Sequence, residues 1–406
     1  MTLPGVDAAW AWLASRRRAG RDRDPRVARG LLDLMGLPDP PAVVHVVGTN
    51  GKGSVATAVA AMARAAGHRS GCFVSPHVEE YAERIAVDGL RISEPDVLRF
   101  VERARGLVES GAPAALAAGF FEWTLALALT VFAEREVGMA VVEAGVGARR
   151  DATRALGNVV ASVVTSVDLD HLETLGSDLI EIAADKAAAI RPGVPLITGA
   201  AGLGLRTLLD EAARLGAPVV LTDAGEERAR LPAALVEYGA AAAWPSTRFD
   251  NLRMACAVAR TLGWPEESLM AGAVTPPPPA RFERFDVGET LVVLDGAHDP
   301  AAARRLAQDL PAGAVLVFGA LGRKQGAATL AALAPSVARV IVTSPDPEQP
   351  PGDWACDARL ADPEDALRTA LAWAGPGGTV AVAGSLYLAG RLRPLLRQAT
   401  AVAAAD

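Results

Sequence analysis

The chain has 406 residues, more than one ordinary hydrophobic core needs and enough for two domains. Apolar residues make up 51% of it, but their runs break well before the roughly 20 residues that cross a bilayer, so we expect no membrane association. A formal net charge of −7 gives no reason to expect nucleic acid as a partner. Three widely spaced cysteines and no apolar N-terminal signal favour a cytoplasmic protein without disulfides.

In the first part of the chain, apolar runs of strand length alternate with Ala- and Leu-rich runs of helix length. The segment 42–47 is predicted to be a buried strand, and 54–66 the helix that follows it. Further strands are predicted at 70–74, 139–143, 159–167 and 194–198. Continuous apolar strands separated by helices indicate a parallel sheet covered on both faces.

A run of four prolines at 276–279 interrupts this alternation, because consecutive prolines continue neither a helix nor a central strand. We place a domain boundary there, between domains 1–278 and 279–406. Beyond it, strands are predicted at 291–294, 314–318, 339–343 and 379–383, each followed by a helix. The second domain is therefore expected to be a smaller Rossmann-like unit.

Lysine is rare in this chain: only Lys52, Lys186 and Lys324 occur among 40 basic residues. An abundance of arginine suggests that arginine replaces lysine wherever either side chain serves. A remaining lysine is then a candidate for a role that guanidinium cannot fill, because an ammonium is compact and can become a neutral, nucleophilic amine. This prior directs attention to the three positions without proving a role for any.

The predicted strand 42–47 runs into a glycine-rich turn and then a helix, the layout that binds phosphate. Lys52 would reach the β- and γ-phosphates of a nucleotide, and Ser54 would contact Mg²⁺ or phosphate. Val46 occupies the position of the usual first glycine, so this is a variant loop; a simple glycine-rich turn is the alternative. The predicted ATP-binding residues here are Thr49, Asn50, Gly51, Lys52, Gly53 and Ser54.

Two further candidates follow predicted strands at the sheet edge where ligands bind in such folds. Glu143 ends one strand, and His171 comes shortly after another. Together they would hold a divalent cation such as Mg²⁺ beside the phosphate loop, although each also has a purely structural reading. Lys186 lies in an apolar helix, where a surface lysine is the alternative to a special role.

A series of motifs in order along nearly the whole chain resembles the folylpolyglutamate synthase/dihydrofolate synthase family of the Mur ligase superfamily. The motifs are Gly48–Ser54, Ser75-Pro76-His77, Phe121-Glu122, Glu143–Thr153, Leu169-Asp170-His171, Asp185-Lys186-Ala187, Arg281-Phe282-Glu283, Asp295-Gly296-Ala297-His298 and Gly384–Leu388. The resemblance implies an α/β fold with a P-loop-type parallel-sheet ATPase domain and a smaller Rossmann-like C-terminal domain. It also implies small-molecule substrates: ATP, a pteroate or folate, and L-glutamate. We expect a monomer, although the sequence does not determine the oligomeric state.

The implied reaction is amide formation in two steps. The acid attacks the γ-phosphate of ATP to form an acyl phosphate, and the glutamate amine then displaces phosphate. Positioning and charge neutralisation would supply most of the rate.

The resemblance also implies roles for individual residues. The metal ligands would be Ser75, Glu143 and His171, with Lys186 carrying CO₂ as a carbamate. Further nucleotide contacts would be Asn251, Arg281 and Asp295. Substrate would lie against Arg84, Phe121, Glu122, Arg150, Asp151, Ala152, His298 and Ser385. The residues expected to act in catalysis are Lys52, Lys186, His171 and His298.

Three elements depart from the family's pattern. Asp299 stands where the family has Asn, Arg150 and Arg154 alter the run that ends in Ala-Thr-Asn, and 323–325 keeps only the lysine of an Asp-Lys-Asp element. These departures keep two alternatives open: a Mur-like ligase for another acid and amine, and a nucleotide-binding relative without catalysis. The sequence does not distinguish dihydrofolate synthesis from extension of the glutamate tail.

Overall fold

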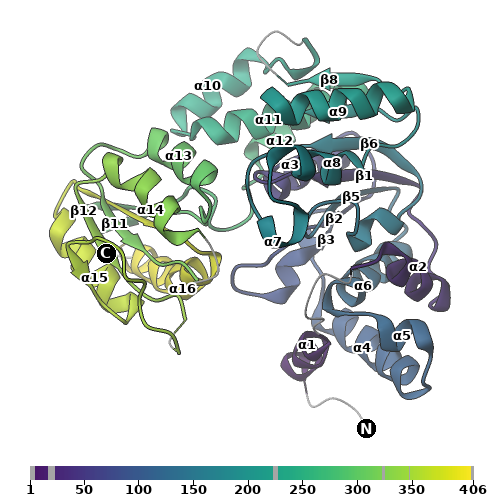
Figure 1. The fold of residues 1–406 in the computed structure, drawn as a ribbon, viewed down its shortest axis with the longest axis horizontal. Coiled ribbons are helices and arrows are strands. Elements are labelled where there is room, and N and C mark those ends of the chain that lie inside the picture. Colours follow the sequence, from purple (N-terminus) through teal and green to yellow (C-terminus); the bar gives the residue numbers. More distant parts are fainter. Residues whose placement is uncertain (1–4, 17–22, 223–226, 322–324, 347, 404–406) are drawn as a thin grey trace. The chain divides into compact units, whose positions relative to one another are not determined.

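The computed structural model describes residues 5–16, 23–222, 227–321, 325–346 and 348–403. The chain divides into unit 1, residues 1–244 and 248–277, and unit 2, residues 245–247 and 278–406. Each unit has its own sheet with helices around it, so the predicted α/β class is confirmed (Figure 1). Within the described residues, no helix combines the length and apolarity needed to span a membrane.

Unit 1 is built on a sheet of eight described strands in the order β4-β3-β2-β5-β1-β6-β7-β8. These strands are β1 (Ala42–Val47), β2 (Ser70–Phe73), β3 (Ile85–Val87), β4 (Leu90–Arg91), β5 (Met139–Glu143), β6 (Val159–Val164), β7 (Leu196–Thr198) and β8 (Val219–Leu221). β1 lies at the centre, parallel to β5 on one side and to β6 on the other. The ends of these three strands therefore meet at one edge.

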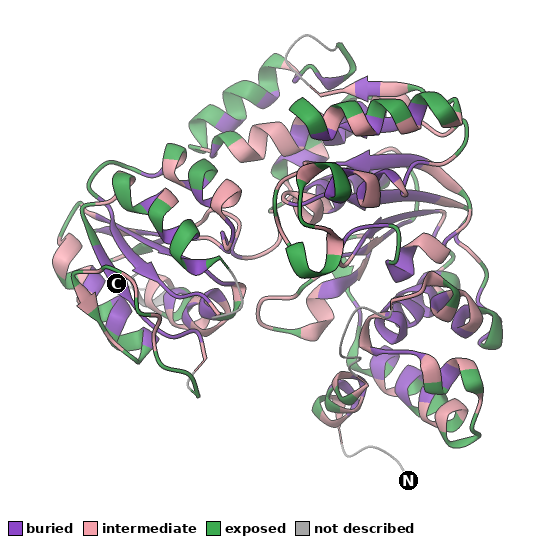
Figure 2. Cartoon of the chain, viewed as in Figure 1, coloured by how far each residue is buried: buried purple, intermediate pink, exposed green. Residues whose placement is uncertain are grey.

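Helices cover both faces of this sheet. The longer helices are α1 (Val6–Ser15), α2 (Pro25–Leu34), α3 (Lys52–Ala65), α4 (Glu94–Glu109), α6 (Phe120–Glu134), α8 (Leu179–Ala187), α9 (Gly202–Leu215), α10 (Ala233–Ala241) and α11 (Ser246–Thr261). The short helices are η1 (Tyr81–Arg84), α5 (Pro113–Ala117), η2 (Ala152–Ala155), α7 (Leu172–Leu175), η3 (Glu227–Ala229), η4 (Glu266–Ser268) and α12 (Leu269–Val274). The central strands are buried while the outer helix faces are exposed (Figure 2).

Side chains of β1 alternate between two cores, as the two-residue period of a strand requires. Val44 and Val46 join the core formed with α3, α11 and α12. Val43 joins the core formed with α1, α2, α4 and α6. His45 therefore points to the same face as Val43.

The sheet of unit 1 is not wholly parallel, in contrast to the prediction. β2 pairs with β3 and β3 pairs with β4 in antiparallel fashion. These two strands are short, and β4 is exposed, so they carry little of the continuous apolar signal that marks a buried parallel strand. The antiparallel hairpin extends one edge of an otherwise parallel sheet.

Unit 2 has six described strands in the order β13-β12-β11-β14-β10-β9. They are β9 (Glu283–Val287), β10 (Thr290–Leu294), β11 (Val315–Phe318), β12 (Arg339–Val342), β13 (Ala358–Arg359) and β14 (Thr379–Ala383). Its helices are α13 (Pro300–Asp309), α14 (Gly326–Leu333), η5 (Ala334–Ser336), α15 (Pro363–Ala374) and α16 (Leu386–Ala403). The sheet is parallel except for β9, which pairs antiparallel with β10.

One predicted connection in unit 2 is wrong. β12 was expected to lead directly into a helix, but in the described part of 343–357 the chain stays irregular and then forms β13. Pro345, Pro350 and Pro351 lie in this stretch. Because proline lacks an N–H and fixes φ, this composition opposes both a helix interior and a central strand.

Candidate nucleotide and metal site

The phosphate loop connects β1 to α3, which begins at Lys52. Gly51 caps this helix in the left-handed region at φ 83°, and Gly48 has φ 146°. A Cβ atom at Gly48 would overlap the hydroxyl of Thr165, and one at Gly51 would overlap the side-chain oxygen of Asn251. Both glycines are therefore needed for close approach as well as for backbone conformation. Asn251, a predicted nucleotide contact, lies directly against the loop.

The segment that follows β6 holds the phosphate loop in shape. The Thr49 and Asn50 amides donate to Ser166, at its carbonyl oxygen (3.0 Å) and its Oγ (3.1 Å). Thr165 Oγ1 donates to the Asn50 carbonyl at 2.6 Å. The sequence analysis did not single out Thr165 or Ser166. Their position after a strand next to β1 was the available signal.

Lys52, Glu143 and Ser75 come together at this edge. Lys52 Nζ donates to the Thr49 carbonyl at 3.1 Å and lies 4.0 Å from Glu143 Oε1. Glu143 ends β5, is 3% exposed, and its Oε2 accepts from the Ser75 amide at 2.8 Å. A buried carboxylate next to a serine and a phosphate loop is a donor set that suits Mg²⁺.

His171 adopts a left-handed conformation at φ 51° and caps the short helix α7. Its Nε2 lies 3.4 Å from Asp170 Oδ2, and its side chain is 40% exposed. The structure thus pairs this predicted metal ligand with Asp170, a carboxylate that belonged to the matched motif but was given no role.

Lys186 is a buried ionisable group of unit 1. It lies in α8 and is 1% exposed. Burial, together with repulsion from Lys52, lowers the pKa of Lys186 to about 8, although Asp185, Asp170 and Asp168 favour its charged form. Lys186 is therefore not a surface lysine, and its amine is partly neutral near physiological pH.

Two of the predicted substrate residues, Phe121 and Asp151, lie against Gly145. A Cβ atom at Gly145 would lie 2.9 Å from the Phe121 ring and 3.2 Å from Asp151 Oδ2. The Asp151 carboxylate is buried and accepts from the Val146 amide at 3.1 Å, and burial raises its pKa. Ala152, which opens η2, is buried as well. Phe121 and Asp151 thus flank the same piece of backbone.

The other predicted substrate residues of unit 1 have visible local roles. Glu122 Oε2 accepts from the Gly119 amide at 3.0 Å and so caps α6. Arg84 is buried, donates to His77 Nδ1 at 2.9 Å and stacks over the Phe120 ring. Arg150 is exposed. Hence only Arg150 presents its side chain broadly to solvent.

In unit 2 the predicted residues bind nearby backbone. Asp295 Oδ2 accepts from the Phe282 amide at 2.7 Å and Oδ1 from the Ala297 amide at 2.8 Å; burial raises its pKa although Arg281 opposes the rise. His298 Nδ1 donates to the Gly296 carbonyl at 3.0 Å. Phe282 has φ 52°, so Asp295 holds the segment carrying Arg281 in an unfavourable conformation.

Ser385 precedes α16 and accepts from the Tyr387 amide at 3.1 Å through Oγ. It is 5% exposed. Like the other predicted residues of unit 2, it shapes the turn in which it lies.

Comparison with known proteins shows to which family the chain belongs. Residues 280–386 match the family described as Mur ligase, glutamate ligase domain. The folylpolyglutamate synthase of Lacticaseibacillus casei is 30% identical over 95% of this chain and 97% of its own length. The chain belongs to the folylpolyglutamate synthase/dihydrofolate synthase family. The resemblance seen in the motifs is thereby confirmed.

Two solved structures of this family contain ligands. A bifunctional folylpolyglutamate synthase/dihydrofolate synthase from Yersinia pestis, complexed with AMPPNP and a Mn ion, matches with TM-score 0.82 and 25% identity over 97% of this chain and 98% of that one. Escherichia coli FolC in complex with DHPP and ADP matches with TM-score 0.80 and 27% identity, with the same coverage of both chains.

Some relatives are longer. A protein of Halobacterium salinarum described as "Probable bifunctional folylpolyglutamate synthase/dihydropteroate synthase" is 32% identical over 95% of this chain, but the match covers 51% of that protein. A Haloferax volcanii relative with the same description is matched over 47% of its length. The chain thus spans about half the length of these two curated relatives.

Departures from the folylpolyglutamate synthase pattern have local explanations. Asp299 caps α13 by accepting from the Ala301 and Ala302 amides at 2.9 Å, a role that Asn and Asp perform equally well. Arg154 donates to the Ala188 carbonyl, at the end of the helix that carries Lys186. Of the altered element 323–325, Arg323 and Lys324 lie outside the described residues.

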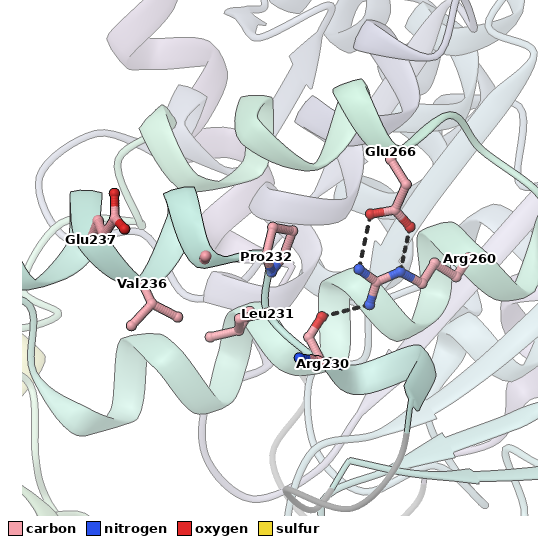
Figure 3. Close-up of a pocket in the computed structure, with 8 residues that line it drawn as sticks. Arg230, Leu231, Pro232, Val236, Glu237, Arg260 and Glu266 are labelled. Atoms are coloured by element: carbon pink, nitrogen blue, oxygen red, sulfur yellow. Dashed lines mark hydrogen bonds and ion pairs between the residues drawn. The ribbon is translucent and has the colours of Figure 1, made fainter.

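A hollow of about 550 Å³ opens near the start of α10 (Figure 3). Its lining includes Arg260, whose guanidinium bonds to the Glu266 carboxylate and the Arg230 carbonyl. Arg260 is nine residues beyond Asn251 in α11, about 13 Å along the helix. The hollow contains none of the predicted site residues of this ligase family member.

Proposed function

We propose that the protein is an ATP-dependent ligase that joins L-glutamate to dihydropteroate, to folylpolyglutamate, or to both, releasing ADP and phosphate. A carboxylate oxygen of the acid attacks the γ-phosphorus, ADP leaves, and the glutamate amine then displaces phosphate from the acyl carbon. The observation that carries the proposal is the ordered phosphate loop with Lys52 beside the buried Glu143, in a member of this family.

We assign the nucleotide phosphates to the loop 48–54. Its amide and lysine donors would neutralise charge that develops during phosphoryl transfer. Asn251 lies against Gly51, which supports its assignment to the nucleotide. Arg281 and Asp295 are assigned to the same ligand, and His298 and Ser385 to the incoming glutamate.

Glu143 would hold Mg²⁺ together with Ser75 and His171. The buried carboxylate and the adjoining serine support this, because Mg²⁺ prefers oxygen ligands. When bound, the ion would draw charge from the phosphate oxygens. The test measures ADP release as a function of magnesium concentration. We expect Glu143→Gln to change the magnesium concentration at which release saturates.

Lys186 would carry a carbamate. Only a neutral amine reacts with CO₂, and a pKa of about 8 leaves roughly one amine in ten neutral at pH 7. A carbamate would also turn repulsion from Lys52 into attraction. Lys186→Ala should abolish turnover, and a small carboxylic acid should restore part of it. Full activity of the wild type in CO₂-free buffer would contradict the carbamate.

The acid-binding side is assigned to Phe121 and Asp151, which flank Gly145, and to Glu122, Arg150 and Ala152, which adjoin them in the chain, whereas Arg84 is assigned to the incoming glutamate. We also propose a cytoplasmic monomer. Three free cysteines support a reducing compartment, and light scattering of the purified protein tests the monomer.

The decisive assay measures ADP release with dihydropteroate or tetrahydrofolate, each with and without glutamate. We expect release only when an acid of this class and glutamate are both present. ADP release that ignores both would remove the proposal. Activity confined to a different acid and amine would instead support a Mur-like ligase, and glutamate-dependent release excludes a catalytically inactive relative.

A further inference from the structure

A buried chain of three polar side chains links the central strand to the acid-binding loop. His45 lies in β1, is 1% exposed, and its Nε2 is 2.8 Å from Thr153 Oγ1. Thr153, also 1% exposed, donates from Oγ1 to Asp151 Oδ1 at 2.6 Å. The Thr153 amide donates to the same oxygen at 3.0 Å. A polar chain this deep must be fully matched in donors and acceptors, or it costs stability.

The hydrogen-bond chain fixes the tautomer of His45. A threonine hydroxyl has one proton, and here it goes to the Asp151 carboxylate, so Thr153 Oγ1 must accept from His45. The His45 proton therefore lies on Nε2. Burial and the nearby Arg191 and Arg154 lower the pKa of His45 to about 3, which keeps the ring neutral. In the described residues Nδ1 has no hydrogen-bond partner.

We propose that His45 and Thr153 are positioning residues for the acid substrate: they orient the Asp151 carboxylate and, through it, the loop from Gly145 to Asp151. The inference rests on the proposed function, in which this loop faces the acid. It adds a role for β1 beyond the phosphate loop. The C-terminal end of β1 leads into the proposed ATP site, whereas His45, on the same face of β1 as Val43, serves the acid substrate.

The burial pattern supports positioning over packing alone. An apolar residue at position 45 would fill the space between β1 and η2 without leaving the unpartnered Nδ1 that the imidazole leaves. What the imidazole supplies is a donor aimed at Thr153. The Asp151 Oδ2 atom is held separately by the Val146 amide, so both carboxylate oxygens are fixed. Loss of the Thr153 hydroxyl would leave Oδ1 with one donor fewer, and loss of the His45 imidazole would leave the Thr153 hydroxyl without the donor that fixes its direction.

The test compares KM values for the acid and for ATP in paired variants. His45→Met and Thr153→Val remove the hydrogen bonds while keeping volume, whereas His45→Gln and Thr153→Ser retain a donor or hydroxyl. We expect the first pair to raise KM for the acid about ten-fold with KM for ATP nearly unchanged, and the second pair to stay near the wild type. His68→Met, at an exposed histidine, is the control.

The double variant His45→Met/Thr153→Val decides whether the two residues act as one unit. We expect its KM for the acid to be no higher than that of the more impaired single variant, because either substitution alone already breaks the hydrogen-bond chain. The proposal would be overturned if the two single rises in KM for the acid multiplied in the double variant, or if KM for ATP rose equally. The proposal would also be overturned if both single variants kept their stability and neither showed the ten-fold rise in KM for the acid.

A spectroscopic arm separates this inference from the proposed function. In protein labelled with ¹⁵N-histidine, His45 should show a protonated Nε2 and an unprotonated Nδ1 throughout pH 5–8, and Thr153→Val should shift that signal. A His45 ring that titrates in this range, or carries its proton on Nδ1, would refute the hydrogen-bond chain. If the wild type lacked folate-dependent turnover but kept this signal, the proposed function would fail while the hydrogen-bond chain would stand.

Discussion

The strand ends of the two units carry similar residue types but use them differently. In unit 1, charged side chains meet one another: Lys52 approaches Glu143, and Lys186 is close enough to Lys52 for the two to repel. In unit 2, Asp295 accepts from the Phe282 and Ala297 amides, and Asp299 accepts from amides in the first turn of α13. Strand ends in the two sheets thus hold a cluster of charged groups in one case and carboxylates bound to backbone amides in the other.

The difference teaches that a motif's position does not determine its physical task. Charged groups that face one another at a strand end are candidates for ligand binding. A carboxylate saturated by local amides instead sets the conformation of the residues around it. The variants below test this contrast, in order of decreasing free-energy effect.

Lys52→Arg should produce the largest effect. Lys52 fits between the Thr49 carbonyl and Glu143, where a larger planar guanidinium would displace one of them. We expect turnover, measured as ADP release, to fall about 10³-fold. Arg64→Lys, the reverse exchange near the other end of α3, is the control. Retention of more than a tenth of the turnover would contradict a specific role for the ammonium.

Lys186→Met should stabilise the fold at pH 7 in CO₂-free buffer by about 3 kcal/mol, while removing activity. The native pKa of about 8 lies below the ordinary 10.5, so the unfolded chain binds more protons between these values. Wild-type stability must therefore rise with pH from about 8 to 10.5, and the advantage of the variant must disappear. Urea unfolding of both proteins at pH 7, 9 and 10.5 measures this. A difference in unfolding free energy between the two proteins that stays the same at all three pH values would contradict the burial penalty.

Asp295→Asn should destabilise the protein by about 2 kcal/mol. Asparagine offers one acceptor oxygen, so its NH₂ group would face the amide of either Phe282 or Ala297. Denaturant unfolding measures the loss. Asp286→Asn, an exposed carboxylate on β9, is the matched control and should change little. Equal effects of the two substitutions would show that the Asp295 hydrogen bonds are not important.

Asp299→Ala should cost about 1 kcal/mol, the usual value for a lost helix cap. Asp299→Asn should keep both stability and turnover, because asparagine caps the helix through the same oxygen position. Thermal unfolding and ADP release together measure this pair. A ten-fold loss of turnover in Asp299→Asn would place the carboxylate in the ligand site and weaken the contrast between the two units.

Much of the fold could be predicted because buried parallel strands are continuous apolar runs. The predicted bounds of β1, β5 and β14 agree with the structure. The strands that escaped prediction are short or lie at sheet edges, such as β4 and β13. Their formation depends on a neighbour that supplies hydrogen bonds, and single-sequence periodicity carries no information about that neighbour.

The candidate site shows the same limit. Lys52 and Glu143 could be singled out because each follows an apolar strand, and such strand ends converge. Ser166 was not singled out: its position after a strand next to β1 was the available signal, and a hydroxyl that accepts from one backbone amide adds no sequence signature of its own. Glu122 illustrates the reverse: its motif predicted substrate contact, while the structure shows a helix cap. That predicted contact remains a proposal.

The sequence by itself determined the alternation of strands and helices, the glycine-rich phosphate loop and the small set of lysines to consider. Burial and charge environment were decided by tertiary structure. Lys186 lies in an apolar segment whose lysine could have faced solvent, yet folding places it 1% exposed near Lys52, 134 positions away in the chain. The physical reason is that a pKa depends on neighbours in space and on lost hydration, and both arise only when distant segments pack together.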